Sequence, residues 1–276
     1  MTPELDPGAL ALEMKVAQDS AQQLEPFTAR YSGFDLAAAY EVADVVHRAR
    51  MAAGARSVGR KIGFTNHEMW SVYGVREPIW GYLYDKTVVQ LDDTRATCSL
   101  GRFVEPKIEP EIVFGFRTAP RPGASIPGIL ESIDWVANGF EVVQSHFPGW
   151  RFQAADTVAD GGLHGNLLIG PRQSVSQLGS DAMAALESFT LTLSCDGQPV
   201  TTGKGSNVLG SPLAAIAHLL EVLARQPDYA PLQAGDIVTT GTITTAETIQ
   251  PGETWQSEVQ GIALPDLAVE FFDGKG

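Results

Sequence analysis

Cysteine is scarce in this chain. Cys98 and Cys195 are the two cysteines among 276 residues, and they form no CxxC pair or other zinc-type spacing. Their spacing argues against a cysteine-ligated zinc site, and a reducing cytoplasm is the simplest setting for so few cysteines. Both lie in apolar, strand-like runs, so we expect inert core residues rather than reactive thiols.

Positive charge and long apolar runs are also lacking. The chain carries 19 Lys and Arg against 33 Asp and Glu, a formal net charge of −14. This balance disfavours binding to nucleic acids or to anionic membranes. No apolar run reaches the length of a membrane span, and the first residues lack the basic and apolar regions of a signal peptide. We therefore expect a cytoplasmic protein with neither nucleic-acid nor membrane partners.

The chain does contain enough apolar sequence for a full core, with 44% hydrophobic residues. Its first part favours helices. Gly8 to Gln22 is rich in good helix formers. Asp35 is a plausible N-cap for a helix from Leu36 to about Ala53, which Gly54 can end. These stretches predict a helical N-terminal segment over residues 1–55.

From residue 56 the pattern changes to short apolar, β-branched runs separated by turns. Predicted strands cover residues 58–64, 87–91, 109–116, 135–143, 167–169, 189–195, 199–202, 237–240 and 267–272. Ser211 and Pro212 open one further helix, as an N-cap followed by proline at the first helical position. The sequence therefore predicts an α+β protein, in which the helical segment packs on a mixed or mainly antiparallel β-rich domain over residues 56–276.

Three glutamates lie inside the predicted strands, Glu109 and Glu111 in one strand and Glu141 in another. Side chains at positions i and i+2 of a strand point to the same face, so Glu109 and Glu111 are directed to one place. Ionised carboxylates share a partly buried site only when a cation compensates them. Because all-oxygen ligation favours Mg²⁺ or Mn²⁺ over Zn²⁺, the three residues are a candidate site for one of these ions.

The alternative is that Glu109 and Glu111 are solvated residues on the open face of an antiparallel strand. Pro106 and Pro110 favour the metal site slightly. Proline breaks ladder hydrogen bonds, which indicates an edge strand or an irregular strand bent toward a site.

Six short motifs follow one another along the chain. They are RKIGFT at 60–65, WGYLYD at 80–85, IEPEI at 108–112, DTVAD at 156–160, VLGSP at 208–212 and AGDIVTTG at 234–241. From about Ala37 to about Phe272, this ordered set resembles the 2-keto-4-pentenoate hydratase and 4-oxalocrotonate decarboxylase family of the fumarylacetoacetate hydrolase superfamily. The resemblance implies a mixed β-roll core with flanking helices and homo-oligomers. It also implies a Mg²⁺ or Mn²⁺ site made by Glu109, Glu111 and Glu141.

The chain departs from the family pattern near the expected substrate. Gln144-Ser145-His146 stand where many hydratases have Asp-Ser-Arg, and residues 161–165 (GGLHG) replace a common Asn-Ala-Ser. Gln153 stands in place of a common lysine. We therefore place Gln153 in the substrate site and expect His146, Gln153 and His164 to influence which reaction occurs.

Lys61 lies in a short apolar run. A strand lysine is usually a surface residue whose amine reaches water. Near a metal, a partly buried lysine can have a lowered pKa and move protons at neutral pH. The resemblance implies that catalytic role, with Asp85 close enough to hold and tune the amine. Asp85 could equally be a turn residue before the next strand.

Two histidines are further acid–base candidates. His164 lies between glycines that permit close approach to a ligand, although it could equally be a loop histidine with a local hydrogen bond. His67-Glu68 resembles the Glu-His pairs with which carbon–carbon hydrolases of the superfamily activate water. Adjacent residues diverge on a strand or a helix, so this pair requires an irregular loop.

Candidates for binding the substrate carboxylate follow later in the chain. Thr240 and Thr242 offer hydroxyl groups at the end of a predicted strand, and Lys204 offers a cation between two glycines. The simpler interpretations are an ordinary strand end with a turn and a solvated loop lysine.

The leading functional hypothesis is a hydratase acting on a 2-hydroxy-2,4-dienoate, or its 2-oxo tautomer, from aromatic-ring degradation. The C1 carboxylate and C2 oxygen would bind the metal, which stabilises negative charge at C2, and Lys61, tuned by Asp85, would transfer the proton. A 2-oxo-3-enedioate decarboxylase would use the same enolate. An acylpyruvate-type carbon–carbon hydrolase would add a base such as His67 or His164. A non-catalytic partner subunit is the alternative from another class, and the intact glutamate triad argues against it.

Overall fold

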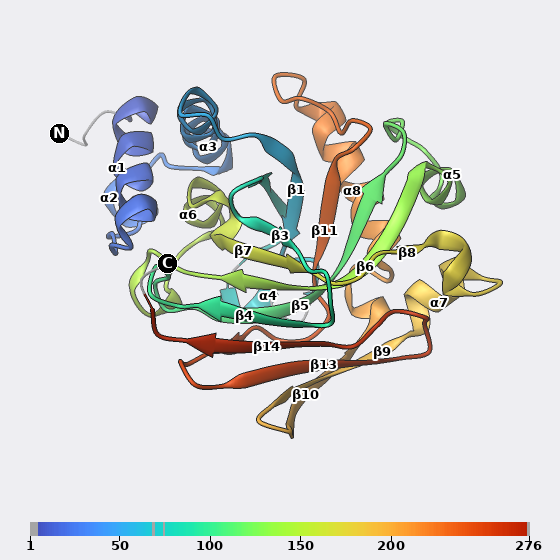
Figure 1. Ribbon diagram of the computed structural model, residues 1–276. Coiled ribbons are helices and arrows are strands. Elements are labelled where there is room, and N and C mark those ends of the chain that lie inside the picture. The colour runs from blue at the N-terminus through green and yellow to red at the C-terminus, as the bar shows by residue number, and fades with distance from the viewer. Residues whose placement is uncertain (1–4, 68–69, 74, 275–276) are drawn as a thin grey trace.

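Two β-sheets form the body of the protein, seen in a computed structural model that describes residues 5–67, 70–73 and 75–274 (Figure 1). The larger sheet has the order β2-β1-β11-β5-β6-β7-β3, with β12 paired to β5 and β8 paired to β6. The smaller sheet has the order β10-β9-β13-β14-β4. The strands are β1 Ser57–Gly63, β2 Ile79–Tyr84, β3 Val88–Gln90, β4 Arg95–Ser99, β5 Lys107–Phe116, β6 Ile133–Val143, β7 His164–Ile169, β8 Gln173–Ser174, β9 Thr190–Cys195, β10 Gln198–Lys204, β11 Ile237–Thr242, β12 Glu247–Thr248, β13 Thr254–Gln260 and β14 Leu267–Phe272.

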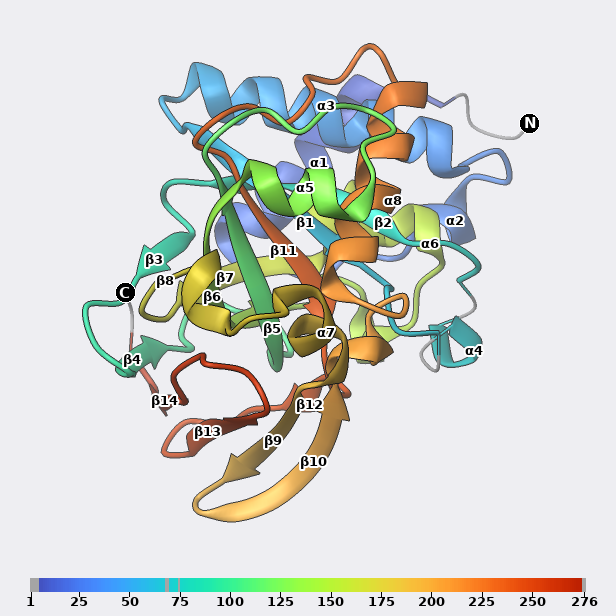
Figure 2. The same cartoon turned by 90° about the vertical axis from the view of Figure 1, so that its right-hand side faces the viewer.

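Helices flank these sheets. The α-helices are α1 Pro7–Ser20, α2 Phe27–Arg30, α3 Leu36–Ala52, α4 Trp70–Tyr73, α5 Ile126–Ser132, α6 Ala154–Ala159, α7 Ala182–Ser188 and α8 Pro212–Arg225. Short 3-10 turns are η2 Pro148–Trp150, η3 Gly161–Leu163, η4 Val175–Leu178 and η5 Gly205–Asn207. The hairpin β9–β10 projects from the body at the bottom of Figure 2.

Most strand pairs are antiparallel, whereas β1–β11, β3–β7 and β4–β14 are parallel. This arrangement confirms the predicted α+β fold with a mixed β core. The prediction missed several elements, among them β2, β4 and β13. Polar residues in β4 and β13 interrupt the apolar alternation that marks a strand, whereas β2 is a continuous apolar run without alternation.

The helical start of the chain forms as its sequence predicts. The Asp35 carboxylate accepts a hydrogen bond from the Ala38 backbone N–H at 3.0 Å, which confirms it as the N-cap of α3. Helix α1 buries Leu10, Ala11 and Met14. It packs on α3, and α3 packs on α6, so these helices cover the end of the larger sheet where β2 lies.

One helical stretch, from Gly205 to Arg225, is long and apolar enough to cross a membrane by length and composition. The expectation of no such run therefore needs correction. Its apolar side is buried through Leu213, Ile216, Leu220 and Leu223, against α5 and β11. This packing is that of a core helix.

The strand that carries Glu109 and Glu111 is central rather than an edge strand, so that part of the prediction was wrong. β5 lies between β11 and β6. It is nevertheless irregular beside Pro110: Thr239 pairs with Val113, but Thr242 pairs with Glu111, so β11 has one extra residue there. The missing proline N–H is accommodated at this bulge.

Candidate active site

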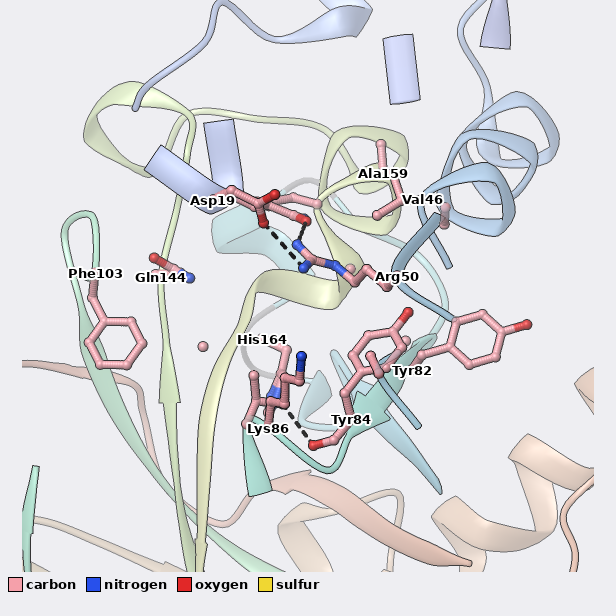
Figure 3. Close-up of a pocket in the computed structure, with 18 of the residues that line it drawn as sticks. Asp19, Val46, Arg50, Tyr82, Tyr84, Lys86, Phe103, Gln144, Ala159 and His164 are labelled. Carbon is pink, nitrogen blue, oxygen red and sulfur yellow. Dashed lines mark hydrogen bonds and ion pairs between the residues drawn. The ribbon is translucent and has the colours of Figure 1, made fainter. Parts of the chain in front are cut away.

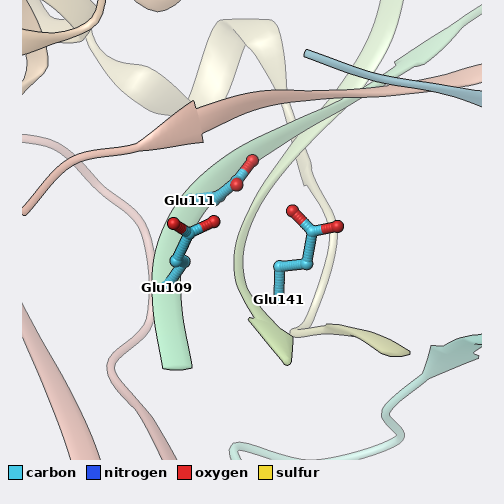
Figure 4. Close-up of side chains that lie close together, drawn as sticks. All are labelled: Glu109, Glu111 and Glu141. Atoms are coloured by element: carbon cyan, nitrogen blue, oxygen red, sulfur yellow. The ribbon is translucent and has the colours of Figure 1, made fainter. Parts of the chain in front are cut away.

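Glu109, Glu111 and Glu141 come together where β5 and β6 run side by side (Figure 4). Glu109 lies directly opposite Glu141 in the ladder, and Glu111 lies two residues further along β5. Carboxylate oxygens of all three lie within 4.8 Å of one another. Glu111 and Glu141 are fully buried and Glu109 is half-buried, so these are not residues of a solvated face.

The Glu111 carboxylate is held by β11. Its Oε2 accepts hydrogen bonds from the Gly241 N–H at 2.8 Å and from the Thr239 hydroxyl. Gly241 has φ +94°, and a Cβ there would lie 1.9 Å from Thr65 Oγ1, so this position requires glycine. The other oxygen, Oε1, is buried and has no hydrogen-bond donor among the described residues. A buried carboxylate oxygen without a donor fits the role of a metal ligand.

Glu141 is held from two sides. Lys61 Nζ, from β1, lies 2.9 Å from Oε2, and His164 Nδ1, from the start of β7, lies 2.7 Å from Oε1. The second ring nitrogen of His164, Nε2, lies 2.9 Å from the Thr87 hydroxyl. A histidine that uses both nitrogens in this way fixes the carboxylate's position, as partners of metal ligands commonly do.

The charges at the triad are unbalanced. Burial, only partly offset by Lys61, raises the pKa of Glu109 to about 7, and burial raises the pKa of Glu111 well above its ordinary value. For Glu141, Lys61 and His164 outweigh burial and lower the pKa to about 2. The Lys61 ammonium therefore compensates the charge of one carboxylate. The charge of the other two carboxylates fits compensation by a hard divalent cation.

Lys61 is buried beside the three glutamates, and its pKa is raised. Its side chain is 3% exposed, so it is not a surface lysine. Burial disfavours the charged amine, but Glu141, Glu109 and Glu111 together raise its pKa above the ordinary value. The pKa is raised because three carboxylates act on one amine, and the lowered pKa expected beside a metal ion stays a prediction.

Glu109 is the residue of the triad that lines a small neighbouring cavity of about 40 Å³, called here the triad cavity. Lys61, Glu109, Trp150, Gly162 and Thr242 all line it, and Lys61 is the one cationic side chain there within the described part of the chain. The Thr242 hydroxyl is buried and has no hydrogen-bond partner among the described residues. This hydroxyl is therefore available to a bound molecule.

Backbone strain concentrates around this cavity. Phe64, Trp150 and Leu163 have φ values of 56°, 57° and 64°, in the left-handed region that non-glycine residues rarely adopt. All three line the cavity. Strained backbone of this kind persists where the surrounding structure enforces it, and it clusters at functional sites.

Asp85 does not lie beside Lys61, and its predicted role in tuning that amine is wrong. Its carboxylate accepts hydrogen bonds from the Arg56 backbone N–H and from Arg56 Nε, both at 3.0 Å. Lys61 instead pairs with Gly81, four residues before Asp85, in the β1–β2 ladder. Asp85 follows the last residue of β2 and belongs to the turn there, as the alternative interpretation held.

Three predicted substrate-binding residues do not line the cavity at the triad. The Thr240 hydroxyl donates to the Ile112 carbonyl at 3.1 Å. Lys204 is exposed at the end of β10 in the smaller sheet. Gln153 is exposed, and its backbone N–H donates to Asp156 where α6 begins. None of the three lines the cavity at the triad, whereas Thr242 does.

His146 is buried but serves another contact. Its Nδ1 lies 2.8 Å from Asp160, and neither residue lines the triad cavity. His67 is exposed and packs edge-on against Trp70, with ring centroids 4.4 Å apart. Glu68, its predicted partner, lies outside the described residues. The described residues thus give no support to a water-activating pair at His67.

Thr87 and Thr239, which sequence reasoning overlooked, complete the site together with the Gly241 N–H. Thr239 and Gly241 fall within a motif that was recognised, but the β11 bulge decides which of its residues face Glu111. Thr87 carried no signal, since its role depends on β3 lying beside β7.

Comparison with known proteins agrees with this geometry. The family model for the C-terminal domain of fumarylacetoacetate (FAA) hydrolase matches residues 88–267. This chain belongs to the fumarylacetoacetate hydrolase family. The resemblance found in the sequence motifs is thereby confirmed.

Relatives within the fumarylacetoacetate hydrolase family include two kinds of enzyme. A 2-keto-4-pentenoate hydratase of Paraburkholderia xenovorans (strain LB400) is 30% identical over 263 residues, 95% of this chain and 94% of that protein. A 4-oxalocrotonate decarboxylase of Pseudomonas sp. (strain CF600) is 30% identical over 255 residues, 92% and 93% of the two chains.

A solved structure extends the comparison to the fold. The 4-oxalocrotonate decarboxylase from Pseudomonas putida G7, complexed with magnesium and adipate, superposes with a TM-score of 0.88. The two chains are 27% identical, and the match covers 98% of this chain and 99% of that one. The two chains therefore share the same overall fold.

Proposed function

We propose that this protein is a divalent-metal-dependent lyase, a hydratase that adds water to a 2-hydroxy-2,4-dienoate or its 2-oxo-enoate tautomer. The observation that carries the proposal is the buried glutamate triad with an unpaired Glu111 oxygen beside Lys61. Hydratases that are about 30% identical over most of the chain support it.

We propose Mg²⁺ or Mn²⁺ as the cofactor, held by Glu109, Glu111 and Glu141, because the ligand atoms are all carboxylate oxygens. When bound, such an ion supplies Lewis acidity to the oxygens of a 2-oxo acid head. The protein supplies the geometry: Gly241 and Thr239 fix Glu111, and His164 fixes Glu141.

Lys61 is the proposed proton-transfer group. Its Nζ lies at the wall of the cavity against Glu141 and holds a proton there, because the three carboxylates favour the charged amine. Compensation of those carboxylates by a cation lowers the pKa of Lys61 and makes its proton transferable at neutral pH.

Thr242 is the proposed substrate-binding residue. Its hydroxyl is buried at the cavity without a protein partner, so it can donate to a substrate oxygen. The cavity of about 40 Å³ is large enough to hold a water molecule. A hydratase needs a water molecule in this position, beside the substrate's conjugated chain.

The second candidate is a 2-oxo-3-enedioate decarboxylase, which requires the same triad and no positioned water. The observation that favours it is the fold match to a decarboxylase bound to a dicarboxylate, with a TM-score of 0.88. A carbon–carbon hydrolase has less support, because both His164 nitrogens are already bonded and His67 is exposed. A non-catalytic subunit would have no use for an intact triad.

We further propose that the protein forms homo-oligomers in the cytoplasm, as the family resemblance implies. The N-terminal helices and the β-rich part are proposed to form one structural unit, because α3 packs directly on α6. Light scattering coupled to gel filtration measures the oligomer.

Substrate turnover separates the candidate reactions. The protein is incubated with 2-hydroxypenta-2,4-dienoate, 2-oxo-3-hexenedioate and an acylpyruvate, each with Mg²⁺ and with Mn²⁺. A hydratase removes the dienoate absorbance without release of CO₂. Release of CO₂ from the enedioate, with no loss of the dienoate, would favour the decarboxylase and contradict the hydratase.

A further inference from the structure

A second cavity, larger than the one at the triad, is lined by none of the three glutamates. It measures about 580 Å³ and lies between α1, α3, β2 and β7 (Figure 3). We propose that this cavity is a second binding site, for a planar aromatic or unsaturated carboxylate, and that its ligand alters the metal affinity of the triad through His164. A cavity of this volume suits a small organic molecule.

The charges lining the cavity favour an anion. Its carboxylates are already bonded, Asp19 to Arg50 at 3.2 Å and Asp160 to a buried histidine at 2.8 Å. Lys86 and Arg102 also line it, and neither has a carboxylate partner among the described residues. Both are exposed, so they lie where the cavity opens. The Arg102 guanidinium does donate to the Asn166 side-chain oxygen at 2.5 Å. In a chain with net charge −14, two cations without a carboxylate partner at one opening indicate an anionic ligand.

The walls favour a flat, apolar body for that ligand. Phe103 lies on one side of the cavity, and Tyr82 and Tyr84 lie on the other (Figure 3). The tyrosine wall is rigid: His47 stacks on Tyr82 with ring centroids 3.7 Å apart, and its Nδ1 lies 3.1 Å from the Tyr84 hydroxyl. Val46 adds aliphatic surface. A preformed wall of this kind binds a ring at low entropic cost.

The two cavities share a wall that is one segment thick. Asp160, Gly161 and His164 line the large cavity, whereas Gly162 and Leu163, between them in sequence, line the triad cavity. A Cβ on Gly162 would lie 3.0 Å from Lys61 Cδ, so this segment packs directly against the active-site lysine. A ligand in the large cavity that displaces this segment therefore also alters the triad cavity.

His164 provides the specific connection. It lines the large cavity, yet its Nδ1 lies 2.7 Å from Glu141 and its Nε2 lies 2.9 Å from the Thr87 hydroxyl. Thr87 lines the large cavity as well. A ligand that shifts Thr87 or His164 changes the position of a metal ligand, and such outer partners typically change metal affinity by about 10- to 100-fold.

Binding is tested with 4-fluorobenzoate, followed by its ¹⁹F NMR signal, on protein loaded with Mg²⁺ and saturated with oxalate. Oxalate fills the triad cavity, so probe that still binds lies elsewhere. We expect Lys86→Gln and Arg102→Gln each to weaken the Kd about tenfold, as the loss of a charged hydrogen bond would. Arg121→Gln, an exposed arginine outside the cavity, should leave it unchanged.

The neutral analogue 4-fluorobenzamide is the matched ligand control and should bind much more weakly than the acid. Equal binding of acid and amide, displacement of the probe by oxalate, or an unchanged Kd in both variants would overturn the proposed site. Absence of binding would also overturn it, and is the result expected if a second copy of the chain fills the cavity.

Coupling is tested by the Mn²⁺ affinity, measured by electron paramagnetic resonance with and without 4-fluorobenzoate. Coupling between sites is reciprocal and commonly amounts to about fivefold or more. We expect such a change in the wild type and its loss in Thr87→Val, which removes the hydroxyl beside His164 Nε2. An unchanged Mn²⁺ affinity in the wild type contradicts the coupling. Neither readout uses turnover, so the inference and the proposed hydratase activity can fail separately.

Discussion

Glu109 of β5 lies directly opposite Glu141 of β6 in the larger sheet. Like charges in directly opposed strand positions destabilise a sheet, and here Glu111 adds a third carboxylate within 4.8 Å. Lys61 compensates one of them. The core of the protein therefore contains repulsion between carboxylates that a divalent cation relieves.

The increase in stability caused by a bound metal ion should grow as the pH rises. The pKa of Glu109 is raised from 4.5 to about 7 without an ion. A raised carboxyl pKa stabilises the fold fully below pH 4.5, and this contribution is lost as pH rises through 7. We expect the metal-free melting temperature to fall between pH 5 and pH 8 through this group, and the increase caused by Mg²⁺ to grow over the same range. Differential scanning fluorimetry measures both, and an equal Mg²⁺ effect at pH 5.5 and pH 8 would contradict the assignment.

Glu111→Gln should separate metal binding from stability. It removes a buried charge whose Oε1 has no donor among the described residues, so the metal-free protein should be as stable as the wild type or more stable. Mn²⁺ affinity should fall by about 100-fold or more, since the change removes a ligand rather than an outer partner. Glu258→Gln, an exposed glutamate of β13, is the control for titration calorimetry. Full Mn²⁺ affinity in Glu111→Gln would exclude this residue as a ligand.

Lys61→Ala should reduce turnover far more than metal affinity. Proton transfer by a positioned side chain contributes about 10²- to 10⁴-fold to rate, whereas Lys61 is not expected to be a ligand. The assay is steady-state turnover of the preferred substrate, with Mn²⁺ affinity measured in parallel. Lys204→Met, an exposed lysine of β10, serves as the control. Near wild-type turnover in Lys61→Ala would remove the lysine from the mechanism, and a large loss in Lys204→Met would return Lys204 to the substrate site.

His164→Asn should weaken Mn²⁺ binding by about 10- to 100-fold, because the histidine positions Glu141 from outside the metal site. Raising the Mn²⁺ concentration should restore most of the turnover in this variant. His67→Asn is the matched histidine control, since His67 is exposed. If saturating metal leaves His164→Asn inactive, the histidine acts on the substrate itself.

Asp85→Asn should have little effect on turnover. Its contacts are with Arg56, on the protein surface, and exposed ion pairs contribute little to stability. Steady-state kinetics measure the effect on turnover, and a denaturant titration measures the effect on stability. A drop in turnover comparable to that of Lys61→Ala would restore the role that the family resemblance implied.

The three glutamates of the triad could be predicted from the sequence, but not all of the residues that surround them. Strand alternation placed Glu109 and Glu111 on one face because that rule is local. The contribution of Glu141 depends on the register of β5 against β6, which only the family motifs could indicate. Asp85 was misplaced because nearness in a motif says nothing about its position in the β1–β2 ladder.

The threonines illustrate the same limit. Alternation puts Thr240 and Thr242 on one face of a regular strand. The extra residue in β11 breaks that alternation, so Thr242 reaches the cavity while Thr240 bonds to Ile112. A bulge of one residue is set by tertiary packing, and no pattern in the sequence marked it.

The claim shared by the hydratase and decarboxylase proposals is that the triad binds a divalent ion, which in turn binds a 2-oxo acid head. Oxalate mimics that head, so the most direct test is a calorimetric titration of oxalate into the protein, first without metal and then with saturating Mn²⁺. We predict oxalate binding only in the presence of Mn²⁺, and none in Glu111→Gln under either condition. Oxalate binding that is equally strong without metal, or unchanged in Glu111→Gln, would contradict the account.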